Sequence, residues 1–396
     1  MKQLGEIEVE GRRVLVRVDF NVPLRDGVIT DDTRIRAALP TIEHLRGRGA
    51  RLILASHLGR PKGAGDPAFS LRPVAARLGE LLGAPVAFAT DVVGPSAHAE
   101  EEKLAPGDVL LLENVRFEPG ETANDEQFAA ALGALADVYV DDAFGSAHRA
   151  HASTEGITHH VADAAAGLLL EREVSALGAI LEAPTRPLVA VLGGSKVTDK
   201  IAVIRRFLEL ADTVLIGGAM CFPFFKVQGH AVGASMCEQE GLEPAREALA
   251  LAADARATLR LPLDLGLGER VEASAARRDV DDVEVPEGWM GLDIGPRTAA
   301  AYAQEIAAAG TVFWNGPMGV FELDAFAAGT RAVAEAVASA PGTTVVGGGD
   351  SVAALTMMGL ERSVSHLSTG GGATLELVEG RTLPGVAALE RVAVSR

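Results

Sequence analysis

The chain has 396 residues, 48% of them hydrophobic, and a formal net charge of −18. The length suits two ordinary domains, and the apolar content excludes a disordered chain because a large core can be buried. The net charge argues against nucleic-acid partners. No apolar run approaches the roughly 20 residues that a membrane helix needs, so no membrane partner is expected.

The start of the sequence lacks the apolar core of a signal peptide. The two cysteines, Cys221 and Cys237, do not form a C-x-x-C pair. Reduced, buried thiols are typical of cytosolic proteins. We therefore expect a cytoplasmic protein.

Buried strands alternate with helical segments through the first half of the chain. Apolar runs predict strands at residues 14–18, 51–55, 109–112 and 138–140, and spacing predicts a helix over residues 31–48. Segments that follow these strands carry Arg34, Arg60, Arg116 and Arg149, together with His57, His148 and His151. In a parallel sheet the carboxyl ends of the strands share one edge, where ligands bind.

These side chains are predicted to converge on one anion, because arginine suits bidentate contacts to carboxylate and phosphate. Each arginine taken singly also fits a surface ion pair. His148 and His151 have the spacing of two metal ligands on one turn, but no third ligand is evident. Hydrogen bonding or anion contact is the alternative for both.

A connecting helix is predicted between the two halves. Residues 167–183 have helical periodicity, and the Pro-Thr-Arg-Pro run at 184–187 breaks it. We place a first domain at residues 1–170, the connecting helix and hinge at 171–187, and a second domain at 188–382.

The second half opens with an apolar strand at residues 188–192, followed by the turn GGSKVTDK at 193–200 and a helical pattern from Ile201. Two glycines followed by a helix N-terminus favour the binding of a phosphate group. Lys196 and Lys200, four residues apart, are expected on one face of that helix. The spacing of a Walker A loop is missing. A glycine-rich turn with solvated lysines remains the alternative.

Further glycine turns follow apolar runs at residues 213–216, 311–315 and 343–346, and the last such turn is residues 368–374; further strands are predicted at 259–264 and 289–296. Such turns expose backbone N–H groups, as nucleotide phosphates require. Asp350 is a candidate Mg²⁺ ligand, or alternatively a helix cap. Glu322 is a candidate acceptor for ribose hydroxyls, or a surface acid.

Seven segments together resemble the 3-phosphoglycerate kinase family. They are RVDFNVP (17–23), SHLGRP (56–61), LENVRF (112–117), GGSKV (193–197), WNGPMGVFE (314–322), GGGDS (347–351) and STGGGA (368–373), in the family's order from about residue 12 to about 380. Ala219, where the family usually has a third glycine, and Pro223 depart from the pattern. The resemblance implies an α/β protein of two Rossmann-like domains, each a mostly parallel sheet flanked by helices, with a cleft between them.

The resemblance also implies reversible, Mg²⁺-dependent phosphoryl transfer from 1,3-bisphosphoglycerate to ADP, as in glycolysis, by a monomer that bends at a hinge. The first domain would hold phosphoglycerate through Asp19, Asn21, Arg34, His57, Leu58, Gly59, Arg60, Arg116 and Arg149. The second would hold the nucleotide through Lys200, Gly291, Glu322, Gly348, Gly349, Asp350 and Ser351, with Asp350 on the metal. Arg34 and Lys196 would flank the migrating phosphoryl group, aided by N–H groups near Gly347 and Gly371. Residues 383–396 would pack back on the first domain.

Two other functions fit the sequence less well. A dehydrogenase should show G-x-G-x-x-G after a first strand, and that pattern is not found. A non-catalytic nucleotide sensor would not need the arginines of the first half. A kinase whose acceptor is a carboxylate needs no general base, which agrees with the absence of a triad or paired-carboxylate motif.

Overall fold

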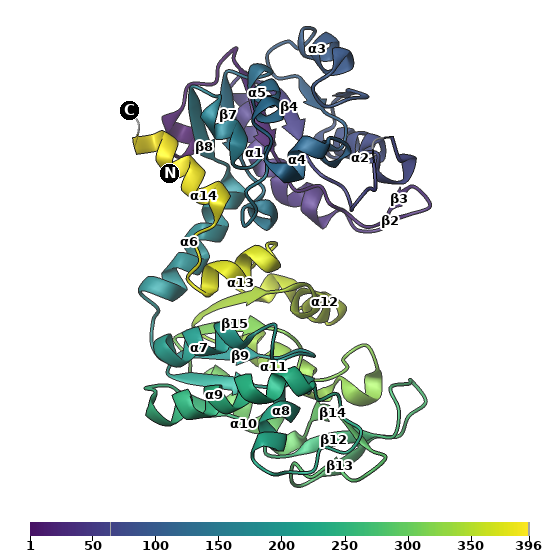
Figure 1. Ribbon diagram of the computed structural model, residues 1–396, viewed down its shortest axis with the longest axis vertical. Coiled ribbons are helices and arrows are strands. Elements are labelled where there is room, and N and C mark those ends of the chain that lie inside the picture. The colour runs from purple at the N-terminus through teal and green to yellow at the C-terminus, as the bar shows by residue number, and fades with distance from the viewer. Residues whose placement is uncertain (64, 395–396) are drawn as a thin grey trace. The chain divides into compact units, whose positions relative to one another are not determined.

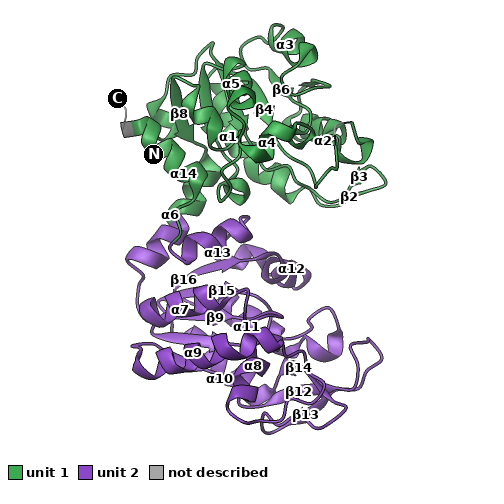
Figure 2. Ribbon diagram, in the orientation of Figure 1, with its two compact units in different colours: residues 1–175, 381–396 green, residues 176–380 purple. Residues whose placement is uncertain are grey.

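The computed structural model describes residues 1–63 and 65–394. The chain divides into two compact α/β units, which are coloured separately in Figure 2. The first unit holds residues 1–175 and the described residues from Arg381 onward, and the second holds residues 176–380. None of the helices described is long and apolar enough to cross a membrane.

The first unit is built on a six-stranded parallel sheet (Figure 1). Its strands, in spatial order, are β5 (Val86–Phe88), β6 (Val109–Leu111), β4 (Arg51–Ala55), β1 (Arg13–Arg17), β7 (Val138–Asp141) and β8 (Asp163–Ala166). A two-stranded hairpin joins β2 (Leu24–Arg25) to β3 (Val28–Ile29). The helices that lie wholly in this unit are α1 (Thr33–Gly47), α2 (Arg72–Leu82), α3 (Pro95–Glu101), α4 (Pro119–Ala123), α5 (Glu126–Ala134) and α14 (Pro384–Val394), whereas α6 (Leu168–Glu182) begins here and continues past Ser175 into the second unit.

Both faces of this sheet are buried, which explains why its strands read as unbroken apolar runs. Val14 and Val16 of β1 belong to one core cluster with Ile35 and Ile42 of α1. Leu15, whose side chain alternates to the other face, is also fully buried. Helix α14, late in the sequence, belongs to this unit because it packs against β8.

The second unit has its own six-stranded parallel sheet. The strand order is β11 (Thr258–Arg260), β10 (Thr213–Ile216), β9 (Leu188–Leu192), β15 (Thr311–Asn315), β16 (Thr343–Gly347) and β17 (His366–Leu367). The helices are α7 (Ile201–Leu210), α8 (Phe222–Val227), α9 (Leu242–Asp254), α10 (Pro296–Ala307), α11 (Ala328–Ser339), α12 (Gly349–Met357) and α13 (Gly372–Val378). Two parallel sheets flanked by helices confirm the predicted fold class.

The second unit also contains a three-stranded antiparallel sheet that sequence reasoning missed. It orders β13 (Arg278–Val280), β12 (Leu265–Gly268) and β14 (Met290–Ile294). Residues 289–296 therefore supply a strand to this small sheet, and not to the parallel one. The predicted strand at 259–264 is also too long, because β11 ends at Arg260. Two glycines in the four residues of β12 weaken its apolar pattern, which hid the sheet from the sequence.

Each parallel sheet has a point where the order of its strands reverses. In the second unit the chain runs from β9 to β10 and β11 on one side, and later returns to β15 on the other. In the first unit β1 lies between β4 and β7 in the same way. Loops that leave such neighbouring strands diverge and open a crevice at their carboxyl ends, where α/β proteins bind ligands.

Candidate functional site

Cationic side chains meet at the carboxyl end of β1 in the first unit. Arg17, the last residue of β1, is only 1% exposed. Its Nε donates to Ser153 Oγ at 2.8 Å, and its Nη2 donates to His57 Nδ1 at 3.2 Å. Sequence reasoning missed Arg17 as a site residue, although a charged residue inside an apolar run was a signal that it could have used.

His57 follows β4 and is buried among these cations. Burial of the ring lowers the pKa of His57 well below its ordinary value, and the surrounding arginines lower it further. They are Arg17, Arg116, Arg34 and Arg149. The imidazole is therefore neutral at pH 7, and the arginines supply the positive charge.

The loop after β1 and the start of α1 meet through Asp19. Its Oδ2 accepts a hydrogen bond from Arg34 Nη1 at 3.0 Å, and its Oδ1 accepts one from Asn21 N at 3.2 Å. Asn21 Oδ1 in turn accepts from Gly59 N at 2.8 Å. Since Asp19 holds one nitrogen of a half-buried Arg34, the rest of that guanidinium can turn to an anion.

Arg60, Arg116 and Arg149 line one hollow of the first unit. Arg116 donates to Gly59 O at 2.5 Å, and burial together with the neighbouring Arg149 lowers the pKa of its guanidinium to about 10. Like charges held this close favour binding of an anion. Leu58 is buried, and its N–H donates to Asn114 Oδ1, so its contribution is to the shape of the loop.

The two histidines of the next loop have protein partners. Arg149 Nε donates to His148 Nε2 at 3.1 Å, and His151 Nδ1 lies 3.7 Å from Glu121 Oε1. Among residues 1–63 and 65–394, no group of three or more His, Cys, Asp or Glu is placed to hold a metal ion. The alternative of a metal site at this pair has no support.

In the second unit, three glycine turns make backbone contact at the reversal between β9 and β15. Gly193 N donates to Asn315 O at 2.9 Å, Gly194 N to Pro317 O at 3.0 Å, and Gly218 N to Met318 O at 3.1 Å. A Cβ on Gly193 would lie 2.1 Å from Pro317 O, so no side chain fits there. The glycines of the sequence pattern thus allow three loops to pack together.

The two lysines of this turn correct the sequence-based prediction. Helix α7 begins at Ile201, so Lys196 and Lys200 precede it and do not share a helical face. The turn is held out of helical geometry because Thr198 N donates to Glu238 Oε1 and Val197 is fully buried. Lys196 is exposed, whereas Lys200 is partly buried.

Lys200 reaches across the crevice to β15. Its Nζ donates to Asn315 O at 3.1 Å and contacts Asn315 Oδ1. Burial lowers the pKa of Lys200 to about 8, although Asp350 and Asp199 partly oppose the shift. An anion placed beside this amine would favour its charged form.

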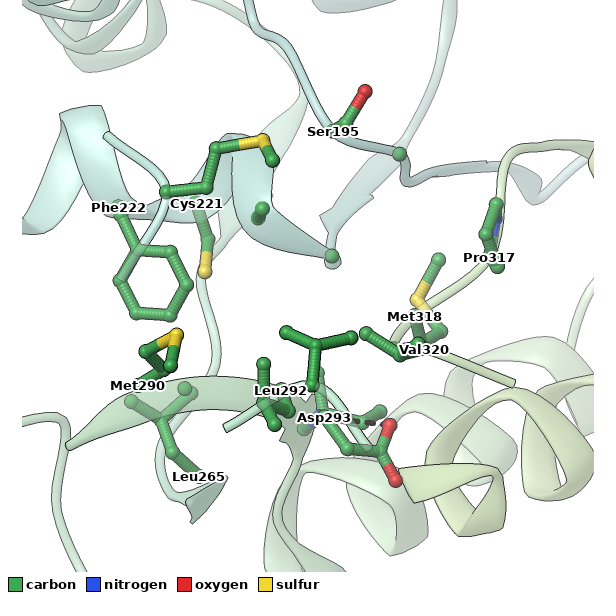
Figure 3. Close-up of a pocket in the computed structure, with 18 of the residues that line it drawn as sticks. Ser195, Cys221, Phe222, Leu265, Met290, Leu292, Asp293, Pro317, Met318 and Val320 are labelled. Atoms are coloured by element: carbon green, nitrogen blue, oxygen red, sulfur yellow. Dashed lines mark hydrogen bonds between the residues drawn. The ribbon is translucent and has the colours of Figure 1, made fainter. Parts of the chain in front are cut away.

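A pocket of about 570 Å³ opens beside these turns (Figure 3). Its apolar part is formed by Phe222, Leu265, Met290, Leu292 and Val320, which Figure 3 labels around the cavity. Its polar contributors include Gly194, Ser195, Glu322 and Asp350, and Gly291 also lines it. An apolar slot that adjoins glycine turns and a few charged side chains suits a base attached to phosphates.

The glycine run before α12 lies next to Asn315. Gly348 has φ +92°, and a Cβ on it would lie 2.7 Å from Asn315 Nδ2, whose hydrogen bond goes to Gly347 O. Ser351 Oγ accepts from Gly316 N at 2.6 Å, so this hydroxyl is already engaged. Gly349 and Gly371 have no atom within 4 Å of a built Cβ, and they precede or begin helices α12 and α13.

Asn315 was not among the predicted site residues, although it ties three of the loops together.

The two departures from the family pattern are accommodated. Ala219 lines the pocket, and its φ angle is not positive, so its backbone does not require glycine. Pro223 lies in the first turn of α8, where proline is tolerated.

The comparisons with known proteins agree with one another. The family model described as phosphoglycerate kinase matches residues 4–381. Phosphoglycerate kinases from Rubrobacter xylanophilus and Moorella thermoacetica are each 56% identical to this chain, with 98% of both chains covered. The solved structure of phosphoglycerate kinase from Coxiella burnetii superimposes with a TM-score of 0.90 at 40% identity, covering 98% of both chains. That from Pyrococcus horikoshii gives 0.88 at 32% identity over the full length of both.

Proposed function

The chain belongs to the phosphoglycerate kinase family, and from that premise we propose that it transfers a phosphoryl group reversibly from 1,3-bisphosphoglycerate to ADP, giving 3-phosphoglycerate and ATP. The observation that carries the proposal is the set of arginines around His57 in the first unit. A nucleotide-binding protein without a second, anionic substrate has no need of it.

We assign phosphoglycerate to the first unit. The carboxylate and phosphate of this small molecule need several cations, and Arg34, Arg60, Arg116 and Arg149 offer planar guanidinium groups for them. Asp19 and Asn21 orient Arg34 and the loop at Gly59 through the hydrogen bonds described above.

We assign the nucleotide to the pocket of the second unit. The base would occupy the apolar slot beside Gly291 and Leu292, Glu322 would accept from the ribose, and the phosphates would approach Lys200 and the start of α12. Gly348, Gly349 and Ser351 contribute backbone N–H groups at that helix start.

Magnesium fits this arrangement through Asp350. The Asp350 carboxylate is exposed and lines the same pocket as Ser195 and Gly194. Mg²⁺ typically binds one or two protein carboxylates together with substrate phosphates, so a dedicated cage of protein ligands is not required. When bound, the metal neutralises phosphate charge.

The residues of this chain would supply positioning and charge. In the direction that consumes ATP the attacking group is a carboxylate, already ionised at neutral pH, so no general base is required. A metaphosphate-like transition state is stabilised by cations and N–H donors. We assign these roles to Arg34 and Lys196, with N–H groups near Gly347 and Gly371.

The domain roles, a hinge within residues 171–187, a monomeric state and a cytoplasmic location complete the proposal. The substrates are small molecules in this family. Light scattering coupled to size exclusion tests the monomer, for which a mass near 41.0 kDa is expected.

The function is tested by following 3-phosphoglycerate-dependent ATP use, coupled to NADH oxidation through glyceraldehyde-3-phosphate dehydrogenase, with and without Mg²⁺. Magnesium-dependent turnover is the expected result. A folded protein that binds ATP but gives no turnover would contradict the proposal and favour a sensor or a changed acceptor.

A further inference from the structure

A buried acid lies behind the arginines of the first unit. Glu121, in α4, is 0% exposed. Burial alone would raise the pKa of its carboxyl, but His151, Arg17 and Ser153 lower it below the ordinary value. Glu121 is therefore an ionised carboxylate that touches the cationic site from inside the protein.

Glu121 is connected to Arg17 through one serine. Ser153 Oγ donates to Glu121 Oε1 at 2.6 Å, and Ser153 N donates to Oε2 at 3.0 Å. The same Oγ accepts from Arg17 Nε at 2.8 Å, and Arg17 continues to His57 Nδ1. The nearby Asp141 Oδ1 instead accepts from Ala143 N.

Glu121 also fixes the loop that carries two site residues. Its carbonyl accepts from Ala152 N at 3.0 Å, and its Oε1 lies 3.7 Å from His151 Nδ1. Thr154 Oγ1 closes the loop by donating to Arg149 O at 2.8 Å. The segment from Arg149 to Thr154 is thereby closed on itself and anchored to Glu121 at residues 151–153.

The charge of Glu121 matters as much as its shape. Arg17 is almost completely buried, and it lies close enough to Arg116 to lower the pKa of that guanidinium. A buried cation that loses one of its neighbouring anions is less favourable there, and Arg17 would turn toward Asp141, the other buried acid that interacts with it.

We propose that Glu121 is a positioning residue for phosphoglycerate: through Ser153 it orients Arg17 and His57, and through its backbone it holds the loop that carries Arg149 and His151. The proposal deepens the proposed function and rests on it, because it names a residue that acts on the first substrate without touching it.

The experiment compares Glu121→Gln with the wild type in the coupled assay. Misplaced positioning groups can cost up to about 10²-fold in rate, so we expect KM for 3-phosphoglycerate to rise at least about fivefold. KM for ATP should stay within about twofold, a split that a general loss of folded protein cannot produce. Equal KM values for 3-phosphoglycerate in the variant and the wild type would overturn the proposal.

Asp137→Asn is the matched control. Asp137 holds Arg13 through Nη2 at 2.7 Å, at the opposite end of β1 from Arg17. Its loss should lower the stability of the first unit and leave both KM values unchanged. If Glu121→Gln does not fold, Ser153→Ala interrupts the same connection and should raise KM for 3-phosphoglycerate about threefold; no change there would overturn the proposal.

A second readout does not depend on turnover. The ¹⁵N NMR shift of His57 Nδ1 reports its contact with Arg17, and we expect it to move in Glu121→Gln and not in Asp137→Asn. An unmoved shift rules out this role for Glu121 even if the wild type lacks kinase activity, whereas an inactive wild type with a moved shift rejects only the proposed function.

Discussion

Gly218 gives the sharpest test of how the glycine turns of the second unit are built. It has φ +68° and ψ −174°, a conformation that is essentially restricted to glycine. A Cβ at this position would lie 2.6 Å from Gly194 N and 2.9 Å from Pro317 O, and both atoms are backbone. Neither neighbour can move aside as a flexible side chain could.

The cost of Gly218→Ala follows from these two observations. Holding alanine in such a conformation costs about 1–3 kcal/mol, and overpacking a tight contact costs typically 1–3 kcal/mol. We therefore expect the free energy of unfolding of the second unit to fall by about 2–6 kcal/mol, the sum of those ranges. Gly349→Ala is the matched control, because nothing lies within 4 Å of its built Cβ and its φ is not positive.

Urea unfolding followed by tryptophan fluorescence measures this loss. The two tryptophans, Trp289 and the fully buried Trp314, both lie in the second unit, so the signal reports on that unit alone. With a urea slope of about 1–3 kcal/mol per M, a loss of about 3 kcal/mol lowers the midpoint by at least about 1 M. If Gly218→Ala unfolds at the same urea concentration as Gly349→Ala, the reasoning from backbone contact is wrong.

Three other predictions concern the reaction. Arg34→Ala and Lys196→Ala should each lower kcat at least about 10²-fold, the scale of a lost transition-state donor, and a near-wild-type kcat in the coupled assay would refute the assigned role. Lys200, with a pKa of about 8 in the free protein, is partly neutral at pH 8; phosphate beside it raises that pKa, so ADP should bind with proton uptake at pH 8 and with none from this group at pH 6. Calorimetry in buffers of different ionisation enthalpy measures the uptake, which Lys200→Met should abolish. Small-angle scattering should show compaction when both ligands are bound, and an unchanged radius of gyration would argue against hinge closure.

The pH dependence of stability from Lys200 has the opposite sign to that of a paired lysine. Its folded pKa of about 8 lies below the ordinary lysine value of 10.5, which the unfolded chain retains. Between these values the unfolded chain binds the additional proton, so this residue makes the second unit more stable as the pH rises from about 8 to about 10. At pH 7 the amine is charged in both states, and its burial is a cost that Lys200→Met should remove.

Local pattern determined most of the fold. Strands β4, β9 and β15 fall where unbroken apolar runs predicted them, because both faces of a parallel sheet are buried and every position must then be apolar. Helices α1 and α6 likewise follow their periodicity to within two residues of the predicted ends. The glycine turns of the second unit were also visible, since they follow closely on strands, whereas Arg34 lies within α1 and Arg149 lies well beyond the end of β7.

Only the tertiary structure decided which residues meet at the sites. Arg17 reads as one residue of a strand, and Asn315 as the end of another, yet each ties several loops together because parallel strands bring distant segments to one edge. Glu121 is more than 100 positions from Arg17 in the sequence and meets it through Ser153. Local spacing predicted that Lys196 and Lys200 share one face of a helix. In the structure the helix begins only at Ile201, and Thr198 N donates to the distant Glu238 Oε1 in the turn before it. The spacing of apolar residues along the chain determines where helices and strands form. Contacts between distant loops depend on the order of the strands in the sheet, which cannot be read from a single sequence.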